Sequence, residues 1–108
     1  MGLNWQHHNP KILKGKEEIE RLRSECSAIN QNITVTNGCF DIVHAGHIHM
    51  LQEASSCGDI LVVLLNSDES VKRLKGKTRP INCLSDRLSI LCALECVDYI
   101  YVFGEDTP

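Results

Sequence analysis

The hydrophobic positions of the chain change their spacing several times along its length. Residues 16–29 place apolar side chains three and four residues apart with charges between them, which predicts a helix with one buried face. Residues 60–65 are apolar without alternation, the pattern of a strand covered on both faces of a parallel sheet. Shorter runs at 33–36 and 99–103 predict two further strands. The apolar positions expected on the first helix are Ile19, Leu22, Cys26 and Ile29.

Three more helices are expected, at residues 47–57, at 69–75 and from Ser85 onward. Gly58 stands where a C-terminal capping glycine belongs, and residues 66–68 can cap the following helix. Strands that alternate with helices predict an α/β domain with a parallel sheet, right-handed crossovers and helices on both faces. The buried face expected for the last helix is Leu88, Leu91, Cys92 and Cys96.

We divide the chain at residue 32. Residues 1–32 form an N-terminal lead-in and the amphipathic helix, and residues 33–108 form the core. Residues 1–15 are polar and contain the breaker Asn9-Pro10, so we expect a loosely docked segment there. The chain is expected to leave its last strand as a loop at 105–108.

Length, charge and cysteine usage exclude several classes of protein. A chain of 108 residues is one small domain, and a net charge of -3 argues against broad binding of nucleic acid or of acidic membranes. No apolar run is long enough to cross a membrane and no export signal opens the chain, so we expect a cytoplasmic protein. The six cysteines lack C-x-x-C spacing, which argues against zinc, and most are interpreted as small buried hydrophobes.

The segment from Asn37 to His47 joins a strand to a helix and carries the most distinctive polar residues. A strand that turns tightly into a helix presents free backbone N–H groups and a positive dipole end, which suits it to bind phosphate. Gly38 allows the tight turn, Gly46 leaves room for a phosphate, and the two imidazoles, of His44 and His47, can donate hydrogen bonds to phosphoryl oxygens. The alternatives are a cap with a core histidine, or a zinc site that lacks further ligands.

Other polar segments are expected beside this turn. The carboxyl ends of parallel strands meet at one edge of the sheet, where ligands bind. Residues 66–68 and 103–107 therefore join the turn there, next to a basic loop at 76–80.

These motifs resemble those of a known family. Gly38-Cys39-Phe40-Asp41 followed by His44-x-Gly46-His47 is similar to the paired signature of the cytidylyltransferase-like nucleotidyltransferases, which have a Rossmann-like fold. Within that superfamily, residues 36–41, 62–68 and 73–82 resemble the bacterial heptose 1-phosphate adenylyltransferases, which form the C-terminal domain of bifunctional ADP-heptose synthase. The resemblance covers residues 33–108 and implies transfer of AMP from ATP to a sugar 1-phosphate with release of pyrophosphate.

The resemblance also implies a role for individual residues. His44 and His47 would act on the triphosphate and its transition state as the catalytic pair. The residues that would bind the nucleotide are Asn37, Gly38, Cys39, Phe40, Asp41 and Gly46. Those that would bind the phosphates of acceptor and nucleotide are Asp68, Lys75, Arg79 and Arg87. Mg²⁺ is expected with the triphosphate, and Asp41 is the one candidate protein ligand for it.

The resemblance leaves alternatives open. Members of the family continue past the position of Pro108 with further strands and a Ser/Thr-rich helix start, so we expect a fold incomplete at its C-terminus and a first strand at the sheet edge. A cytidylyltransferase that uses CTP and glycerol 3-phosphate, and a nucleotide-binding module without turnover, are the competing functions. The expected partners are ATP or CTP and a phosphorylated small molecule, and a homodimer is left open.

Overall fold

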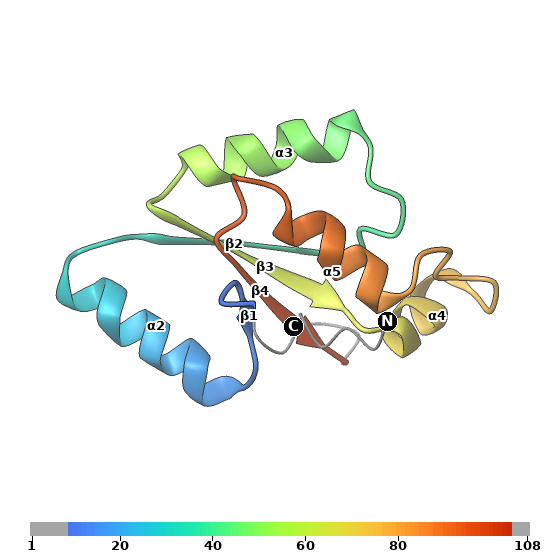
Figure 1. The fold of residues 1–108 in the computed structure, drawn as a ribbon, viewed down its shortest axis with the longest axis horizontal. Helices are drawn as coiled ribbons and strands as arrows, with labels where there is room; N and C mark the ends of the chain where they lie inside the picture. The colour runs from blue at the N-terminus through green and yellow to red at the C-terminus, as the bar shows by residue number, and fades with distance from the viewer. Residues whose placement is uncertain (1–8, 105–108) are drawn as a thin grey trace.

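The computed structural model describes residues 9–104, which fold around a parallel β-sheet (Figure 1). The elements follow one another as β1 (Ile12–Leu13), α2 (Lys16–Ala28), β2 (Ile33–Gly38), α3 (Ala45–Ser56), β3 (Ile60–Asn66), α4 (Asp68–Lys75), α5 (Leu84–Cys92) and β4 (Tyr99–Phe103). The predicted strands and helices are all present. Their ends agree with the prediction within two residues, except that α5 stops at Cys92 whereas its buried face was expected to reach Cys96. The loop expected at 105–108 lies outside the described residues.

The strands of the described segment form one four-stranded sheet in the order β1-β4-β3-β2, with every neighbouring pair parallel. Ile33 on β2 pairs with Ile60 on β3, and Val62 on β3 pairs with Tyr99 on β4. This register brings the ends of β2, β3 and β4 to one edge. The predicted α/β Rossmann-like sheet is therefore confirmed, with β2 as an edge strand among the residues described.

Helices cover both faces of the sheet (Figure 1). On one face α3 and α5 pack through Leu51, Leu88 and Leu91 against alternate residues of β3, such as Leu61 and Val63. On the other face α2 packs through Leu22 and Cys26 against Val62. The central strand β3 is apolar on both sides because each side meets a helix layer.

The N-terminal segment departs from the prediction. Residues 1–15 were expected to be a loosely docked lead-in, and residues 1–8 of it lie outside the described part of the chain. Ile12–Leu13, however, pair with Ile100 and Tyr101 as a strand of the sheet. Lys11 next to this strand donates from Nζ to the carbonyls of Cys92 and Leu94, both at 3.0 Å, and so holds the end of α5. A two-residue strand has no periodicity that a sequence pattern can show.

Three side-chain expectations are wrong at the level of packing. Ile29 is 65% exposed because α2 ends before it. Cys96 follows α5, which stops at Cys92, so it is not part of that helix, although it packs against the same core. All six cysteines are free. Cys26 is buried and the part-buried Cys92 and Cys96 pack against the core, so half of the six contribute to it rather than most.

Gly58 does not have the left-handed backbone of a capping glycine. Instead, a Cβ on Gly58 would lie 2.5 Å from Thr34 Oγ1 and 3.1 Å from the Asn32 carbonyl oxygen. Glycine is therefore required at this position by the close approach of β2. Among residues 9–104, the glycine with a left-handed backbone is Gly76, with φ 111°, which ends α4.

Within residues 9–104, no helix has the length and hydropathy needed to span a membrane.

Candidate active site

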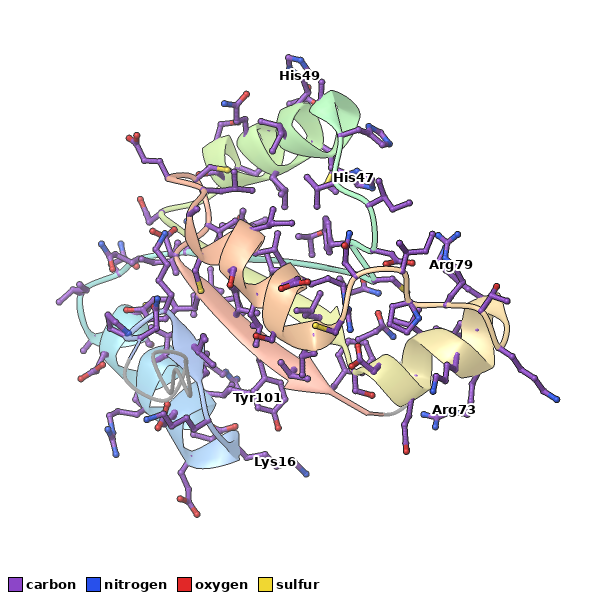
Figure 2. All side chains as sticks on the ribbon, turned by 45° about the vertical axis from the view of Figure 1, so that its right-hand side comes forward. Lys16, His47, His49, Arg73, Arg79 and Tyr101 are labelled. Atoms are coloured by element: carbon purple, nitrogen blue, oxygen red, sulfur yellow. The ribbon has the colours of Figure 1, made fainter. Side chains whose placement is uncertain are left out.

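A cleft of about 580 Å³ opens at the carboxyl edge of the sheet, where β2 and β3 end. One side of it is the segment from Asn37 to His47, and the other is the end of α4 with the loop that follows. Figure 2 shows His47 and Arg79 on the same side of the molecule, whereas His49 lies on the outer surface of α3 and points away from both. The cleft is lined by Asn37, Gly38, Cys39, Phe40, Asp41, Ile42, His44, His47, Met50, Asn66, Leu74, Lys75 and Arg79.

The two histidines are oriented by the backbone at the start of α3. His44 is the N-cap residue, and its Nδ1 accepts from the Gly46 N–H at 3.0 Å. His47 Nδ1 accepts from the His44 N–H at 3.2 Å. A ring nitrogen that accepts carries no proton, so in the neutral form each imidazole has its proton on Nε2. Both histidines are thereby fixed as hydrogen-bond donors through Nε2.

The surroundings of His47 favour the uncharged form of its imidazole. Burial lowers the pKa of His47, and the nearby His44 lowers it further because two imidazolium charges would repel one another. The ring centroids of the two histidines are 4.1 Å apart. A neutral donor can bind a phosphate oxygen and gain strength as negative charge develops there.

Gly46 and Phe40 serve the histidines directly. A Cβ on Gly46 would lie 2.8 Å from Cε1 of the His44 ring, so glycine makes room for that imidazole. Phe40 is only 5% exposed and its ring lies 5.6 Å from that of His47, tilted by 57°. Phe40 therefore supports His47 from the core and presents little surface to a nucleotide.

The turn before the histidines has unusual backbone geometry. Phe40 has φ 47°, a left-handed conformation that is rare for an aromatic residue. A Cβ on Gly38 would lie 2.9 Å from Cε2 of Phe40, so the absence of a side chain at Gly38 lets that ring fold back over the strand end. Glycine and phenylalanine at these two positions form one packing unit.

Asp41 joins the two sides of the cleft. Its carboxylate accepts from Arg79 Nε at 2.7 Å and from the backbone N–H groups of Ile81 and Asn82, both at 2.9 Å to Oδ1. Burial would raise the pKa of Asp41, but these hydrogen bonds from Asn82, Ile81 and Arg79 outweigh it and lower the pKa. Asp41 is a buried anion with its partners in place.

Arg87 lies beneath the cleft and does not line it. Its side chain is fully buried and its three nitrogens all donate: Nε to Asn82 O, Nη1 to Cys39 O and Asn66 O, and Nη2 to Asp68 Oδ1. The predicted assignment of Arg87 and Asp68 to substrate phosphates does not fit this arrangement, because their charges pair with each other at 2.7 Å. Arg87 is a structural arginine that connects the ends of β2 and β3.

The structure brings nine of the twelve predicted site residues to the cleft. Those outside its lining are Gly46, Asp68 and Arg87. The residues that the sequence reasoning did not select as site residues are Ile42, Met50, Asn66 and Leu74. Asn66 ends a buried strand beside an active-site edge, which is a signal that could have selected it. The three apolar residues carry no such signal, because an exposed aliphatic side chain resembles any other in the sequence.

The carboxylates of this region do not form a metal site. Among residues 9–104, no group of three or more His, Cys, Asp or Glu side chains could hold a metal ion. Both oxygens of Asp41 already accept hydrogen bonds, so Asp41 does not fit as a ligand for Mg²⁺. Two cations that could bind an anion, Lys75 and Arg79, line the cleft.

The sequence of this chain is similar to those of known proteins. Residues 35–108 match the family model described as cytidylyltransferase-like. The bifunctional protein HldE of Helicobacter pylori strain J99 is 55% identical over 106 residues, which are 98% of this chain and 22% of that protein. HldE of Wolinella succinogenes is 48% identical over 103 residues, 95% of this chain and 22% of the relative.

A solved structure has the same fold. The lipopolysaccharide core biosynthesis protein from Thermoplasma volcanium GSS1 superposes with a TM-score of 0.62 and 38% identity, over 71% of this chain and 62% of that one. The chain spans about a fifth of the length of the curated relatives it matches. The family model covers more than half of the chain and includes most of β2, the turn and both histidines of the cleft. The chain belongs to the cytidylyltransferase-like family.

Proposed function

We propose that the chain is a nucleotidyltransferase domain that transfers AMP from ATP to a sugar 1-phosphate, specifically heptose 1-phosphate, with release of pyrophosphate. The observation that carries the proposal is the pairing, in one cleft, of two Nε2 donors at a helix N-terminus with Lys75 and Arg79 opposite them. A reaction between two phosphate-bearing substrates needs both sets of donors.

The reaction needs positioning more than it needs a protein nucleophile. An oxygen of the acceptor phosphate attacks the α-phosphorus of ATP in line, a new P–O bond forms, and the bond to the β-phosphate oxygen breaks as pyrophosphate leaves. The attacking oxygen is already an anion, so no general base is required. His44 and His47 donate from Nε2 to the triphosphate, and Lys75 and Arg79 neutralise the acceptor phosphate.

Mg²⁺ is proposed as a companion of the triphosphate, since this ion is commonly bound by substrate phosphates and few protein ligands. Asp41 is not its ligand in this proposal, because the carboxylate already accepts from Arg79 and from backbone N–H groups.

Adenylyl transfer to a heptose phosphate is favoured over cytidylyl transfer by the sequence Lys75-Gly76-Lys77-Thr78-Arg79-Pro80. This loop resembles that of the heptose 1-phosphate adenylyltransferases. The relatives named HldE and the structure named for lipopolysaccharide core biosynthesis support the same assignment.

A pyrophosphate-release assay tests the proposal. The purified chain, with Mg²⁺, is given ATP or CTP together with heptose 1-phosphate or glycerol 3-phosphate. We expect the fastest release with ATP and heptose 1-phosphate, and a loss of about 10²-fold or more in His47→Ala, since one donor to a developing charge contributes about that much. Lys72→Gln, a change of an exposed cation outside the cleft, is the control and retains the rate.

Each other result selects a different function. Faster release with CTP and glycerol 3-phosphate identifies a cytidylyltransferase. Binding of ATP without pyrophosphate release identifies a nucleotide-binding module. If His44→Ala and Arg79→Glu both leave nucleotide and acceptor binding unchanged, the cleft is not the active site.

A further inference from the structure

The cleft has two walls that come from different parts of the chain. The histidine wall is residues 37–47, between β2 and α3, and the cation wall is Lys75 with Arg79, after α4. In-line transfer requires the two substrates to be held at a fixed separation, and a misplacement of about 1 Å can cost about 10²-fold in rate. A contact between the walls therefore matters to the chemistry.

Asp41 makes that contact. Its backbone belongs to the histidine wall, while its carboxylate accepts from Arg79 Nε at 2.7 Å on the cation wall. The same carboxylate accepts from the N–H groups of Ile81 and Asn82, and Asn82 Nδ2 returns a hydrogen bond to the Asp41 carbonyl. Asp41 is 4% exposed, so water does not compete for these contacts.

The contact engages only part of the Arg79 side chain. Asp41 accepts from Nε, and neither Nη of Arg79 donates a hydrogen bond to an acceptor among residues 9–104. The Arg79 side chain is 32% exposed and lines the cleft. Arg87 is the opposite case, because it is fully buried and each of its nitrogens donates to the protein.

A guanidinium fixed at Nε presents its two Nη groups in a defined plane. Two such groups match the spacing of two phosphate oxygens, and an arginine that is already immobilised loses less rotamer entropy when it binds. An arginine with no partner at Nε would have to be ordered by the substrate itself.

We propose that Asp41 is a positioning residue that orients Arg79 for the acceptor phosphate and sets the distance between the two walls. This inference rests on the proposed function for the identity of the substrate, and it goes beyond that function in giving Asp41 a role other than nucleotide or Mg²⁺ binding. Asp41 touches no substrate and acts through Arg79.

Steady-state kinetics of Asp41→Asn test the role in the reaction. Asparagine keeps an oxygen for the Ile81 and Asn82 N–H groups but removes the charge that holds Arg79. We expect the KM for heptose 1-phosphate to rise about 10-fold or more while the KM for ATP changes less than 3-fold, in line with loss of one charge-assisted hydrogen bond. Asp86→Asn, at an exposed carboxylate of α5, is the matched control and leaves both values unchanged.

A second measurement reads the Arg79 geometry without any turnover. In an ¹⁵N-correlation spectrum of the arginine Nε–Hε groups, Arg79→Lys identifies the Arg79 signal by its loss. We expect the Hε hydrogen of Arg79 to exchange slowly with water in the wild type and rapidly in Asp41→Asn. The signal of Arg87, whose Nε donates to Asn82 O at 3.1 Å, stays protected and reports that the variant is folded.

The two measurements separate the inference from the function on which it rests. An absence of pyrophosphate release in the wild type, with the expected loss of Arg79 protection in Asp41→Asn, rejects the proposed function and supports the orienting contact. Retained Arg79 protection in that variant, or KM values that rise equally for both substrates, overturns the proposal for Asp41.

Discussion

Each imidazole of the cleft is oriented by a backbone N–H donor. The Gly46 and His44 N–H groups donate to the Nδ1 atoms of His44 and His47, and these N–H groups are among those that the start of a helix leaves without helical partners. One set of hydrogen bonds thus caps α3 and fixes the tautomer of both histidines. Replacement of either histidine is expected to affect the helix start as well as the phosphate donors.

The pKa of His47 is a residue-scale prediction. Burial and then the charge of His44 lower it below the ordinary 6.5. We expect a proton titration of the His47 ring by NMR to give a midpoint below 6.5 in the wild type. In His44→Asn, which retains a capping side chain but no titrating charge, the midpoint rises, although burial keeps it from rising fully.

The same shift makes stability depend on pH. Between the lowered pKa and 6.5 the unfolded chain binds more protons at this position than the folded chain. The contribution of a neutral His47 to folding is therefore complete above pH 6.5 and is lost as the pH falls through the folded-state pKa. A wild-type His47 midpoint at or above the ordinary value contradicts the prediction.

At the scale of elements, β2 depends on a close contact with the start of β3. Gly58 precedes β3 and leaves no space for a side chain, because Thr34 Oγ1 and the Asn32 carbonyl occupy the position of a Cβ. The N–H groups of Asp59 and Ile60 both donate to the Asn32 carbonyl oxygen, at 2.9 and 3.1 Å, and the N–H of Asn32 donates to Asp59 Oδ2 at 2.8 Å. These contacts set the register of the edge strand that carries the histidine wall.

Gly58→Ala is expected to destabilise the fold by about 1–3 kcal/mol, the usual cost of overpacking a close contact. Chemical denaturation gives the free energy of unfolding. Thr34→Ala removes the nearer of the two obstructing atoms and is expected to restore part of the loss in the double variant. If Gly58→Ala has the stability of the wild type, the close approach of β2 is not a constraint.

At the scale of the whole molecule, Arg87 connects segments that are far apart in the chain. Its donors reach the carbonyls of Cys39, Asn66 and Asn82, which follow β2, end β3 and precede α5. Asp68 at the start of α4 balances the buried charge. The floor of the cleft thus depends on one side chain from the helix that packs beneath it.

Arg87→Met is expected to lower the free energy of unfolding by about 3–5 kcal/mol, because the buried carbonyls lose their donors and Asp68 loses its partner. Thermal or chemical unfolding measures this loss. Arg79→Met, at a cation that lines the cleft, is the comparison. We expect it to lower the free energy of unfolding less than Arg87→Met does, and to weaken binding of the acceptor more. Equal stability in Arg87→Met and the wild type would reject the structural role of Arg87.

Much of the fold could be predicted from local patterns. The unbroken apolar run at 60–65 indicated a strand with helices on both faces, and the spacing in residues 16–29 indicated α2. The β1 strand could not be predicted, because two residues pair with β4 only after the sheet has formed. The left-handed Phe40 also has no sequence signature, since its conformation depends on the space that Gly38 leaves.

The sequence by itself determined which residues could bind phosphate: a strand end, two histidines around a glycine, and a basic loop near the same sheet edge. Only the tertiary structure decided which of these cations face the cleft. The sequence pattern did not distinguish the roles of Arg79 and Arg87. In the structure Arg87 is fully buried and each of its nitrogens donates a hydrogen bond, whereas Arg79 lines the cleft and donates from Nε to Asp41. The physical reason is that an arginine takes its role from the acceptors around it, and those acceptors come from distant segments that only the folded chain brings together.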